Sequence, residues 1–318
     1  MLRYILIRIL WLIPVIIIVS FIMFVLIDLA PGTIVDNMIS NAMTLQDVED
    51  LMAKYDLDKP VVIRYVRYMG RLLQGDMGVS NVNGNNVWYV YITRLPKTLL
   101  LSFGALVIGS VISIPMGIFA ALRAGKISDT LTTTFTLVGM SMPGFWLGLL
   151  LMILFSYYLG WLPAGGADQG FRSFILPAVC SGLMLMATST RQTRSSMLEV
   201  LNADYLRTAR AKGVPEKAVI TKHALGNAWI PILTTIGTSL SVSLAGSAII
   251  EQVFAWPGVG RAIIEAVMAR DDIMTTGLVI MTTILYVLVQ LIVDLLYAFV
   301  DPRVRAQYTN SKKRRVVA

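Results

Sequence analysis

Few side chains in this sequence have the chemistry of a catalytic or metal-binding site. The 318 residues include one histidine, His223, and one cysteine, Cys180. A catalytic triad or a zinc site needs several such groups together, and His223 has no evident partner, so its simplest role is a loop contact. Cys180 lies among apolar residues, which is typical of an inert buried thiol. The apolar runs contain no pair of carboxylates of the kind that relays protons. The sequence therefore predicts no catalytic and no metal-binding residues.

One segment superficially resembles a phosphate-binding loop. Ala120-Ala-Leu-Arg-Ala-Gly-Lys-Ile127 places a glycine next to a lysine. It lacks the first glycine and the final serine or threonine of such a loop, and no strand precedes it. We therefore expect no nucleotide binding in this chain.

The most distinctive polar interval spans residues 199–231. Its Ala-rich helical pattern ends at Gly213, which can adopt a left-handed conformation, and Pro215 follows. A second short helix should carry Val219, Ile220 and Leu225 on one side. The interval and its approach are basic: Arg191, Arg194, Arg207, Arg210, Lys212, Lys217 and Lys222 are opposed only by Glu199, Asp204 and Glu216. Such a hairpin is too short to be a domain, and it is suited to dock into a groove on another protein.

The hairpin resembles the cytoplasmic coupling loop of ABC-importer permeases. Ala209 and Gly213 fit the EAA signature of that loop, whereas Arg207 and Thr208 replace its Glu and first Ala, as in the peptide/nickel branch. The alternative is an ordinary basic loop that obeys the positive-inside rule. The resemblance implies contacts with ATPase subunits through Arg207, Thr208, Ala209, Arg210, Ala211, Lys212, Gly213, His223, Ala224 and Leu225.

The composition indicates an integral membrane protein. Hydrophobic residues make up 56% of the chain and charged residues 14%, against about 25% charged in soluble domains. The net charge of +8 comes from residues that flank apolar runs, so it does not indicate nucleic-acid binding. Six spans are predicted, at residues 9–27, 98–122, 130–167, 174–190, 228–250 and 273–293. The third is too long for one straight helix, and Pro143 and Gly144 mark a break within it.

Most of the 27 Lys and Arg residues fall in segments that six spans would place on one side of the membrane. The positive-inside rule then places both termini in the cytoplasm. We expect one transmembrane permease domain over residues 1–318, with a large external loop at 30–95, a cytoplasmic coupling loop at 199–226 and a basic cytoplasmic tail at 303–318. The resemblance implies the type I ABC-importer permease fold, all-α with six transmembrane helices.

The external loop should contain two helices. Thr44 and Asp47 can form a capping box for the first. Pro60 begins the second, which we expect to turn an apolar side inward: Val62, Tyr65, Val66, Met69, Leu72 and Leu73. The loop resembles the first external loop of peptide and nickel permeases, which implies receptor docking. The alternative is a lid that only covers the ends of the spans.

Two further segments are candidates for function. The fifth span is rich in hydroxyls, and Thr234, Thr238 and Ser241 share one helical stripe that we expect to line a hydrated path. Tight helix packing is the alternative explanation. Phe254-Ala-Trp-Pro-Gly-Val-Gly260 resembles the loop before the last span of peptide and nickel permeases. The resemblance implies receptor docking or external gating by Phe254, Trp256, Pro257, Gly258 and Gly260, with Trp256 as an amphipathic anchor at the outer interface.

The resemblance covers essentially the whole chain and implies a permease subunit in a bacterial or archaeal inner membrane. Its implied partners are a second homologous permease in a heterodimer, two cytoplasmic ATPase subunits that bind ATP and Mg, and an extracytoplasmic binding protein. Di- or oligopeptides are the first choice of substrate, and nickel or a metal chelate is the second. A stand-alone secondary transporter would need ion-coupled carboxylates in the spans, where only Asp294 is available. A scaffold without a transport path is the remaining alternative.

Overall fold

The computed structural model describes residues 2–29, 35, 44–54 and 56–300. Within these ranges the protein is helical, and extended backbone pairs only in one isolated bridge between Val79 and Asn86. Four of the described helices are long and apolar enough to cross a membrane: α1 (Leu2–Leu29), α4 (Val87–Leu122), α7 (Phe171–Leu201) and α12 (Asp272–Val300). The number rises to six if each of two bent helix pairs is one span. The predicted all-α membrane architecture is confirmed.

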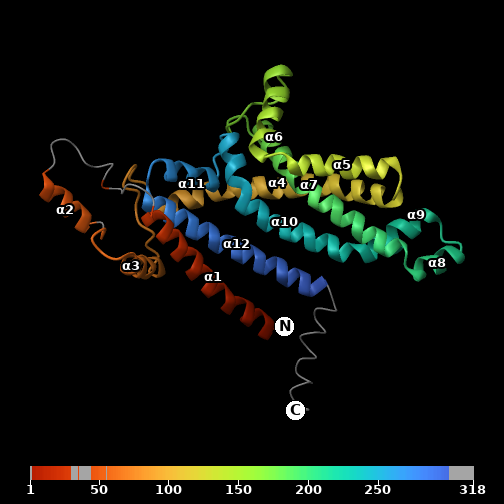
Figure 1. Cartoon of the computed structure of the whole chain (residues 1–318), viewed down its shortest axis with the longest axis horizontal. Helices are drawn as coiled ribbons and strands as arrows, with labels where there is room; N and C mark the ends of the chain where they lie inside the picture. The colour runs from red at the N-terminus through yellow and green to blue at the C-terminus, as the bar shows by residue number, and fades with distance from the viewer. Residues whose placement is uncertain (1, 30–34, 36–43, 55, 301–318) are drawn as a thin grey trace, which may run out of the picture.

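The first bent pair lies where the sequence predicts a break. α5 (Ile127–Ser141) is followed by α6 (Gly144–Leu151), which continues as the π-helix η2 (Met152–Tyr158). The two halves meet at 100°, and α6 rises away from α5 in Figure 1. Pro143 occupies the N-cap of α6 with extended backbone, because its ring restricts φ and it has no N–H to continue the preceding helix. The second bend, of 53°, divides α10 (Leu225–Val253).

The centre of the molecule is formed by α4, α7 and α10, which lie side by side in Figure 1 and pack on one another. The buried positions of α4 that recur every three or four residues are mostly small. They include Ala105, Gly109, Ser113, Gly117, Ala120 and Ala121. Small residues let helix backbones approach closely, which is how helices associate where lipid removes the hydrophobic driving force.

The helix α4 begins well before the predicted start of its span. The sequence predicts a span from residue 98 and an external loop to residue 95, whereas the helix starts at Val87. Asn86 caps it, its side chain accepting a hydrogen bond from the Tyr89 amide at 3.3 Å. The charges of Arg94 and Lys97 interrupt the apolar run, so the hydropathy of the sequence did not reveal this first part of the helix. Both residues are nevertheless compatible with helix. The non-helical segment before α4 therefore ends earlier in the chain than the predicted loop of residues 30–95.

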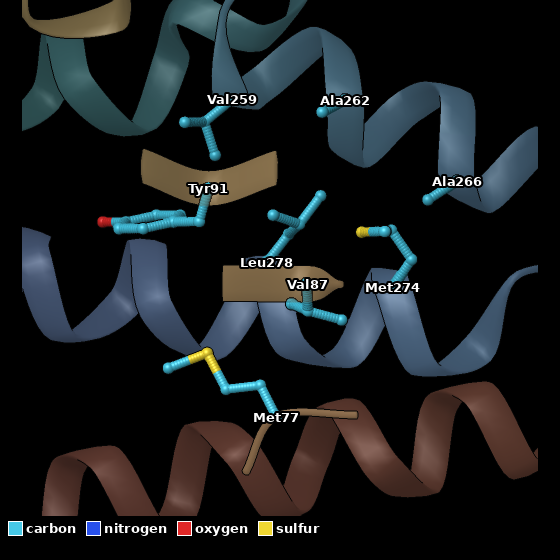
Figure 2. Packing of buried hydrophobic residues seen from close by; sticks show 8 residues of the cluster. All are labelled: Met77, Val87, Tyr91, Val259, Ala262, Ala266, Met274 and Leu278. Carbon is cyan, nitrogen blue, oxygen red and sulfur yellow. The ribbon is translucent and has the colours of Figure 1, made fainter. Parts of the chain in front are cut away.

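The start of α4 packs at the end of the bundle where α12 also begins. There it meets α11 (Val259–Met268), an amphipathic helix between α10 and α12. Figure 2 shows the apolar cluster that joins these three helices, made of Met77, Val87, Tyr91, Val259, Ala262, Ala266, Met274 and Leu278. We call this end of the molecule the α11 end.

Two short helices precede α4. The helix α2 (Leu45–Lys54) has the predicted capping box: the Asp47 carboxylate accepts from the Thr44 amide at 2.7 Å, and Thr44 Oγ1 accepts from the Asp47 amide at 3.2 Å. The helix α3 (Val61–Leu73) packs on α1 through Tyr65, whose ring meets Phe21 edge to face.

The predicted inward face of α3 is partly wrong. Val62 is 54% exposed, Val66 62% and Leu73 85%, whereas Tyr65 and Tyr68 are buried. The two tyrosines lie three residues apart and set the packed face, because their rings bury more surface than a valine. The exposed apolar residues of α3 face away from the chain.

Candidate functional site

The predicted hairpin is formed by four consecutive elements. They are α8 (Asp204–Ala211), the single turn α9 (Glu216–Ala218), the π-helix η3 (Val219–Ala224) and the start of α10. Gly213 ends the first arm with φ of +78°, and its amide donates to the Arg210 carbonyl at 2.9 Å. A left-handed residue at this position is what the sequence predicts, and glycine adopts it without the steric cost of a Cβ atom.

Across the turn, Arg210 and Glu216 form a two-pronged ion pair. Arg210 Nε lies 3.0 Å from one carboxylate oxygen and the terminal nitrogen 2.8 Å from the other. Both side chains are well exposed, so solvent screens the pair and its contribution to stability is small. Its planar geometry does hold the two arms at a defined separation.

Buried apolar side chains fix the hairpin to the ends of the long helices. Leu206, Val219 and Ala224 are each 0% exposed and share a cluster with Met197 of α7. The same cluster contains residues of α4 and α10, namely Ala121, Ala228 and Ile232. A force applied to the hairpin therefore reaches three long helices at once. We call this end of the molecule the hairpin end.

Nine of the ten residues of the predicted coupling surface fall into two groups. Arg207, Thr208, Arg210, Ala211, Lys212 and Gly213 are exposed and lie together on the first arm and turn. Ala224 is fully buried, and Ala209 and Leu225 are half-buried against the same cluster. These three anchor the hairpin from within. His223 is half-buried, and its carbonyl accepts from Asn227 at 2.9 Å.

At the α11 end, the structure shows a buried acid that the sequence analysis did not single out. Glu251 is 0% exposed. One of its carboxylate oxygens accepts from Thr98 Oγ1 at 2.7 Å and Ser247 Oγ at 3.1 Å, and the other accepts from the Arg261 amide at 2.9 Å. Hydrogen bonds of this kind offset the high cost of removing a carboxylate from water.

The nearest arginine in sequence does not neutralise this acid. The guanidinium of Arg261 lies 2.8 Å from Glu265 and donates to the Ala255 carbonyl at 2.6 Å. The Glu251 carboxylate is therefore held by neutral donors among the described residues. It connects α4, α10 and the beginning of α11 through single hydrogen bonds.

The string from Phe254 to Gly260 folds over this acid. Phe254 is 1% exposed and Trp256 2%, and the indole Nε1 donates to the Lys97 carbonyl at 3.0 Å. A Cβ atom on Gly258 would lie 2.3 Å from the Glu251 carboxylate, so only glycine fits there. The prediction that Trp256 is an amphipathic anchor at the outer interface is wrong, because the ring packs inside the chain. Gly258 and Gly260 are also buried, and Pro257 is half-buried.

The predicted path-lining stripe is not uniform. Thr238 is exposed and Thr234 half-buried, and each hydroxyl donates to a carbonyl of its own helix. Ser241 is 1% exposed, and its hydroxyl has no partner among the described residues. The adjacent stripe is buried throughout, at Ser239, Ser243 and Ser247. Packing therefore accounts for the stripe of Ser239, Ser243 and Ser247. In the stripe of Thr234, Thr238 and Ser241, only Thr238 is exposed on the surface of the chain.

A second interaction that the sequence did not reveal lies near the hairpin end. Asp129, in the first turn of α5, is 5% exposed and accepts from Arg194 of α7 at 2.6 and 2.7 Å. The pair links the start of α5 to α7, the helix that leads into the hairpin. The sequence shows each charge but not their proximity, because 65 residues separate them.

No group of three or more His, Cys, Asp or Glu residues in the described part of the chain is placed to hold a metal ion. Cys180 is buried, as its apolar surroundings predict. The described residues therefore form a hairpin packed on three long helices at the hairpin end and a buried, hydrogen-bonded carboxylate at the α11 end.

Comparison with known proteins identifies the family and the fold. Residues 113–306 match the family described as the binding-protein-dependent transport system inner membrane component, and residues 1–102 match the N-terminal region of such membrane components. The fold is similar to that of the inward-facing MetNI methionine ABC transporter, with a TM-score of 0.57 and 18% identity over 67% of this chain and 97% of that one.

The similarity to individual permease proteins extends over nearly the full length of this chain. The oligopeptide transport system permease protein AppB of Bacillus subtilis is 38% identical, covering 96% of this chain and 99% of the relative. The di/tripeptide transport system permease protein DppB of Pseudomonas aeruginosa is 38% identical, with coverage of 96% and 100%. The glutathione transport system permease protein GsiC of Salmonella paratyphi A is also 38% identical, with coverage of 96% and 99%. The chain therefore belongs to the family of inner-membrane permease components of binding-protein-dependent ABC importers.

Proposed function

We propose that this permease subunit forms the translocation path for di- or oligopeptides in an ATP-driven importer. The observation that carries the mechanism is the hairpin, which exposes a basic surface and is anchored by fully buried side chains on α4, α7 and α10. Separate subunits bind ATP and Mg and press on this surface. A homologous permease completes the path, and an extracytoplasmic binding protein delivers the peptide.

The proposed orientation places the hairpin end in the cytoplasm. The basic residues Arg207, Arg210 and Lys212 are exposed there, in accord with the positive-inside rule. The α11 end then faces the binding protein. In this orientation α1 begins, and α12 ends, on the cytoplasmic side.

Movement of the hairpin gives the coupling step. Closure of the ATPase dimer displaces the exposed first arm, and the buried contacts of Leu206 and Val219 transmit the displacement to the long helices. These helices are packed through small residues, so they can slide or rock as bodies between two arrangements. At the far end, the hydrogen bonds of Glu251 keep α10 and α11 together while the path changes access.

Named relatives support the choice of peptide as substrate. The relatives described above are permeases for oligopeptides, for di- and tripeptides and for glutathione, which is itself a peptide. An uptake experiment tests the proposal. The tagged chain is purified from its native membrane with any co-purifying ATP-binding subunits and reconstituted into vesicles with the binding protein.

We expect uptake of a labelled di- or oligopeptide that requires both ATP and the binding protein. ATP-binding subunits that co-purify without any peptide uptake would contradict the substrate assignment. Uptake driven by an ion gradient, with no ATP-binding subunit present, would contradict the mechanism.

A further inference from the structure

A cavity of about 140 Å³, lined by both polar and apolar side chains, lies at the α11 end, away from α10. Its described walls come from α1, α3, the first turns of α12 and the connecting segments. A cavity of about 150 Å³ accommodates one benzene molecule, so this one admits an occupant of only a few heavy atoms.

Two buried hydrogen-bond donors on this wall have no partner among the described residues. Tyr68 is 5% exposed, and neither its hydroxyl nor the Nδ2 atom of Asn81 makes a hydrogen bond. Buried polar atoms in folded proteins are nearly always paired, so two orphans at one cavity point to an occupant that accepts hydrogen bonds. Burial raises the pKa of Tyr68 to about 12, which keeps the phenol protonated and able to donate.

The third donor is a cation on the same helical face. Arg71 follows Tyr68 by three residues and lines the cavity. It forms no ion pair with another described residue, unlike Arg64, which lies 2.5 Å from Asp28. A hydroxyl, an amide and a guanidinium at one wall match the two oxygens of a carboxylate.

Arg64, whose charge is paired with Asp28, also lines the cavity, and the lining includes acidic residues as well. Asp272, in the first turn of α12, lines it, and so does Asp56. Asp56 is already paired with Lys59 and with Arg67, at 2.6 Å from the latter. A phosphate dianion would be repelled by Asp272, whereas an ammonium group would be attracted to it.

We propose that this cavity binds a small zwitterionic α-amino acid. Its carboxylate accepts from Tyr68, Asn81 and Arg71, and its ammonium group faces Asp272. Phe24, Ile27 and Ile273 provide an apolar surface for a small side chain such as that of alanine. The site is separate from the stripe on α10, and it does not depend on the identity of the transported substrate.

Binding of L-alanine to the full chain in lipid nanodiscs tests this inference. We expect saturable binding of one molecule, measured by equilibrium dialysis with labelled L-alanine. Tyr68→Phe and Arg71→Gln should each weaken binding by about tenfold, because each removes one hydrogen-bond donor to a charged group. Tyr89→Phe is the matched control, since Tyr89 is 66% exposed and does not line the cavity.

Competition with fragments distinguishes a zwitterion from a simple anion. Acetate and methylammonium each lack one charged end, so each should compete less well than L-alanine. Absence of saturable binding to the folded wild-type chain would overturn the proposal, as would acetate or inorganic phosphate that binds as tightly as L-alanine. Unchanged affinity in both Tyr68→Phe and Arg71→Gln would also overturn it. If Tyr68→Phe fails to fold, Asn81→Ala takes its place in the comparison.

Discussion

Thr98 of α4 is hydrogen-bonded to both Glu251 of α10 and Val259 of α11. Its hydroxyl donates to the buried Glu251 carboxylate at 2.7 Å and accepts from the Val259 amide at 2.8 Å. One side chain thus ties the last turn of α10 and the first turn of α11 to the same point on α4. This connection makes the segment from Glu251 to Arg261 an internal brace.

Replacing Thr98 with valine tests the brace. The substitution preserves shape, removes the donor to Glu251 and leaves the Val259 amide unsatisfied. We expect a loss of about 1–3 kcal/mol in stability, because buried polar groups are left without partners. Thermal unfolding in detergent measures it. Thr93→Val on the same helix is the control, since Thr93 is exposed and donates only to its own helix. Equal melting temperatures for the two variants would show that the hydrogen bonds of Thr98 do not matter.

Gly258 should tolerate no side chain. A Cβ atom there would lie 2.3 Å from the Glu251 carboxylate, so Gly258→Ala forces the brace apart. Overpacking of this kind costs about 1–3 kcal/mol. Gly226→Ala is the matched control, because no atom lies within 4 Å of the Cβ position at Gly226. A melting temperature for Gly258→Ala equal to that of the control would contradict the close approach.

The Asp129–Arg194 pair should stabilise the hairpin end. Asp129→Asn keeps the size of the side chain and removes the charge that Arg194 contacts at 2.6 Å. We expect a loss of about 1.5–3 kcal/mol, the range for hydrogen bonds to charged groups. Limited proteolysis of the loop between α4 and α5 should then become faster than in the wild type. Unchanged proteolysis and stability would show that the pair is incidental.

Water-accessible labelling tests the stripe on α10. In a Cys180→Ala background, Thr238→Cys should react with a small water-soluble thiol reagent, and Ser239→Cys should not. Thr238 is exposed, whereas Ser239 is 7% exposed in the packed chain. If Thr238 lines a gated path, its labelling rate should change when ATP is trapped by the partner subunits. Equal protection of both cysteines in every state would leave helix packing as the explanation for both stripes.

Local patterns explain why much of the fold could be predicted from the sequence. The break at Pro143, the capping box at Thr44 and the left-handed turn at Gly213 each depend on a few neighbouring residues. The start of α4 was missed because polar residues can continue a helix beyond the apolar run. The inward face of α3 was partly wrong because two tyrosines outweigh the aliphatic residues beside them.

Long-range contacts account for what the sequence did not show at the candidate sites. Glu251 stands directly after an apolar run, but the partner that explains its burial, Thr98, lies 153 residues away in the sequence. The same limit applies to Trp256. Its aromatic side chain favours an anchor at the membrane interface, but in the structure it contacts the carbonyl of Lys97 and the ring of Phe174, which lie far away in the sequence. Long-range packing also decides which residues of the hairpin are exposed, because its buried side chains contact residues of α4, α7 and α10. No local sequence pattern specifies these contacts.

The hairpin as the coupling element is the central claim, and ATP-driven peptide uptake by reconstituted transporter tests it most directly. Gly213 has φ of +78° and open space around its Cβ position, so a substitution there acts through backbone strain alone. Gly213→Val should insert and fold but reduce uptake per ATP hydrolysed by about tenfold, since a β-branched residue resists this conformation. Gly213→Asn, which tolerates the left-handed region, should retain most of the uptake. Normal uptake per ATP by Gly213→Val would contradict the account.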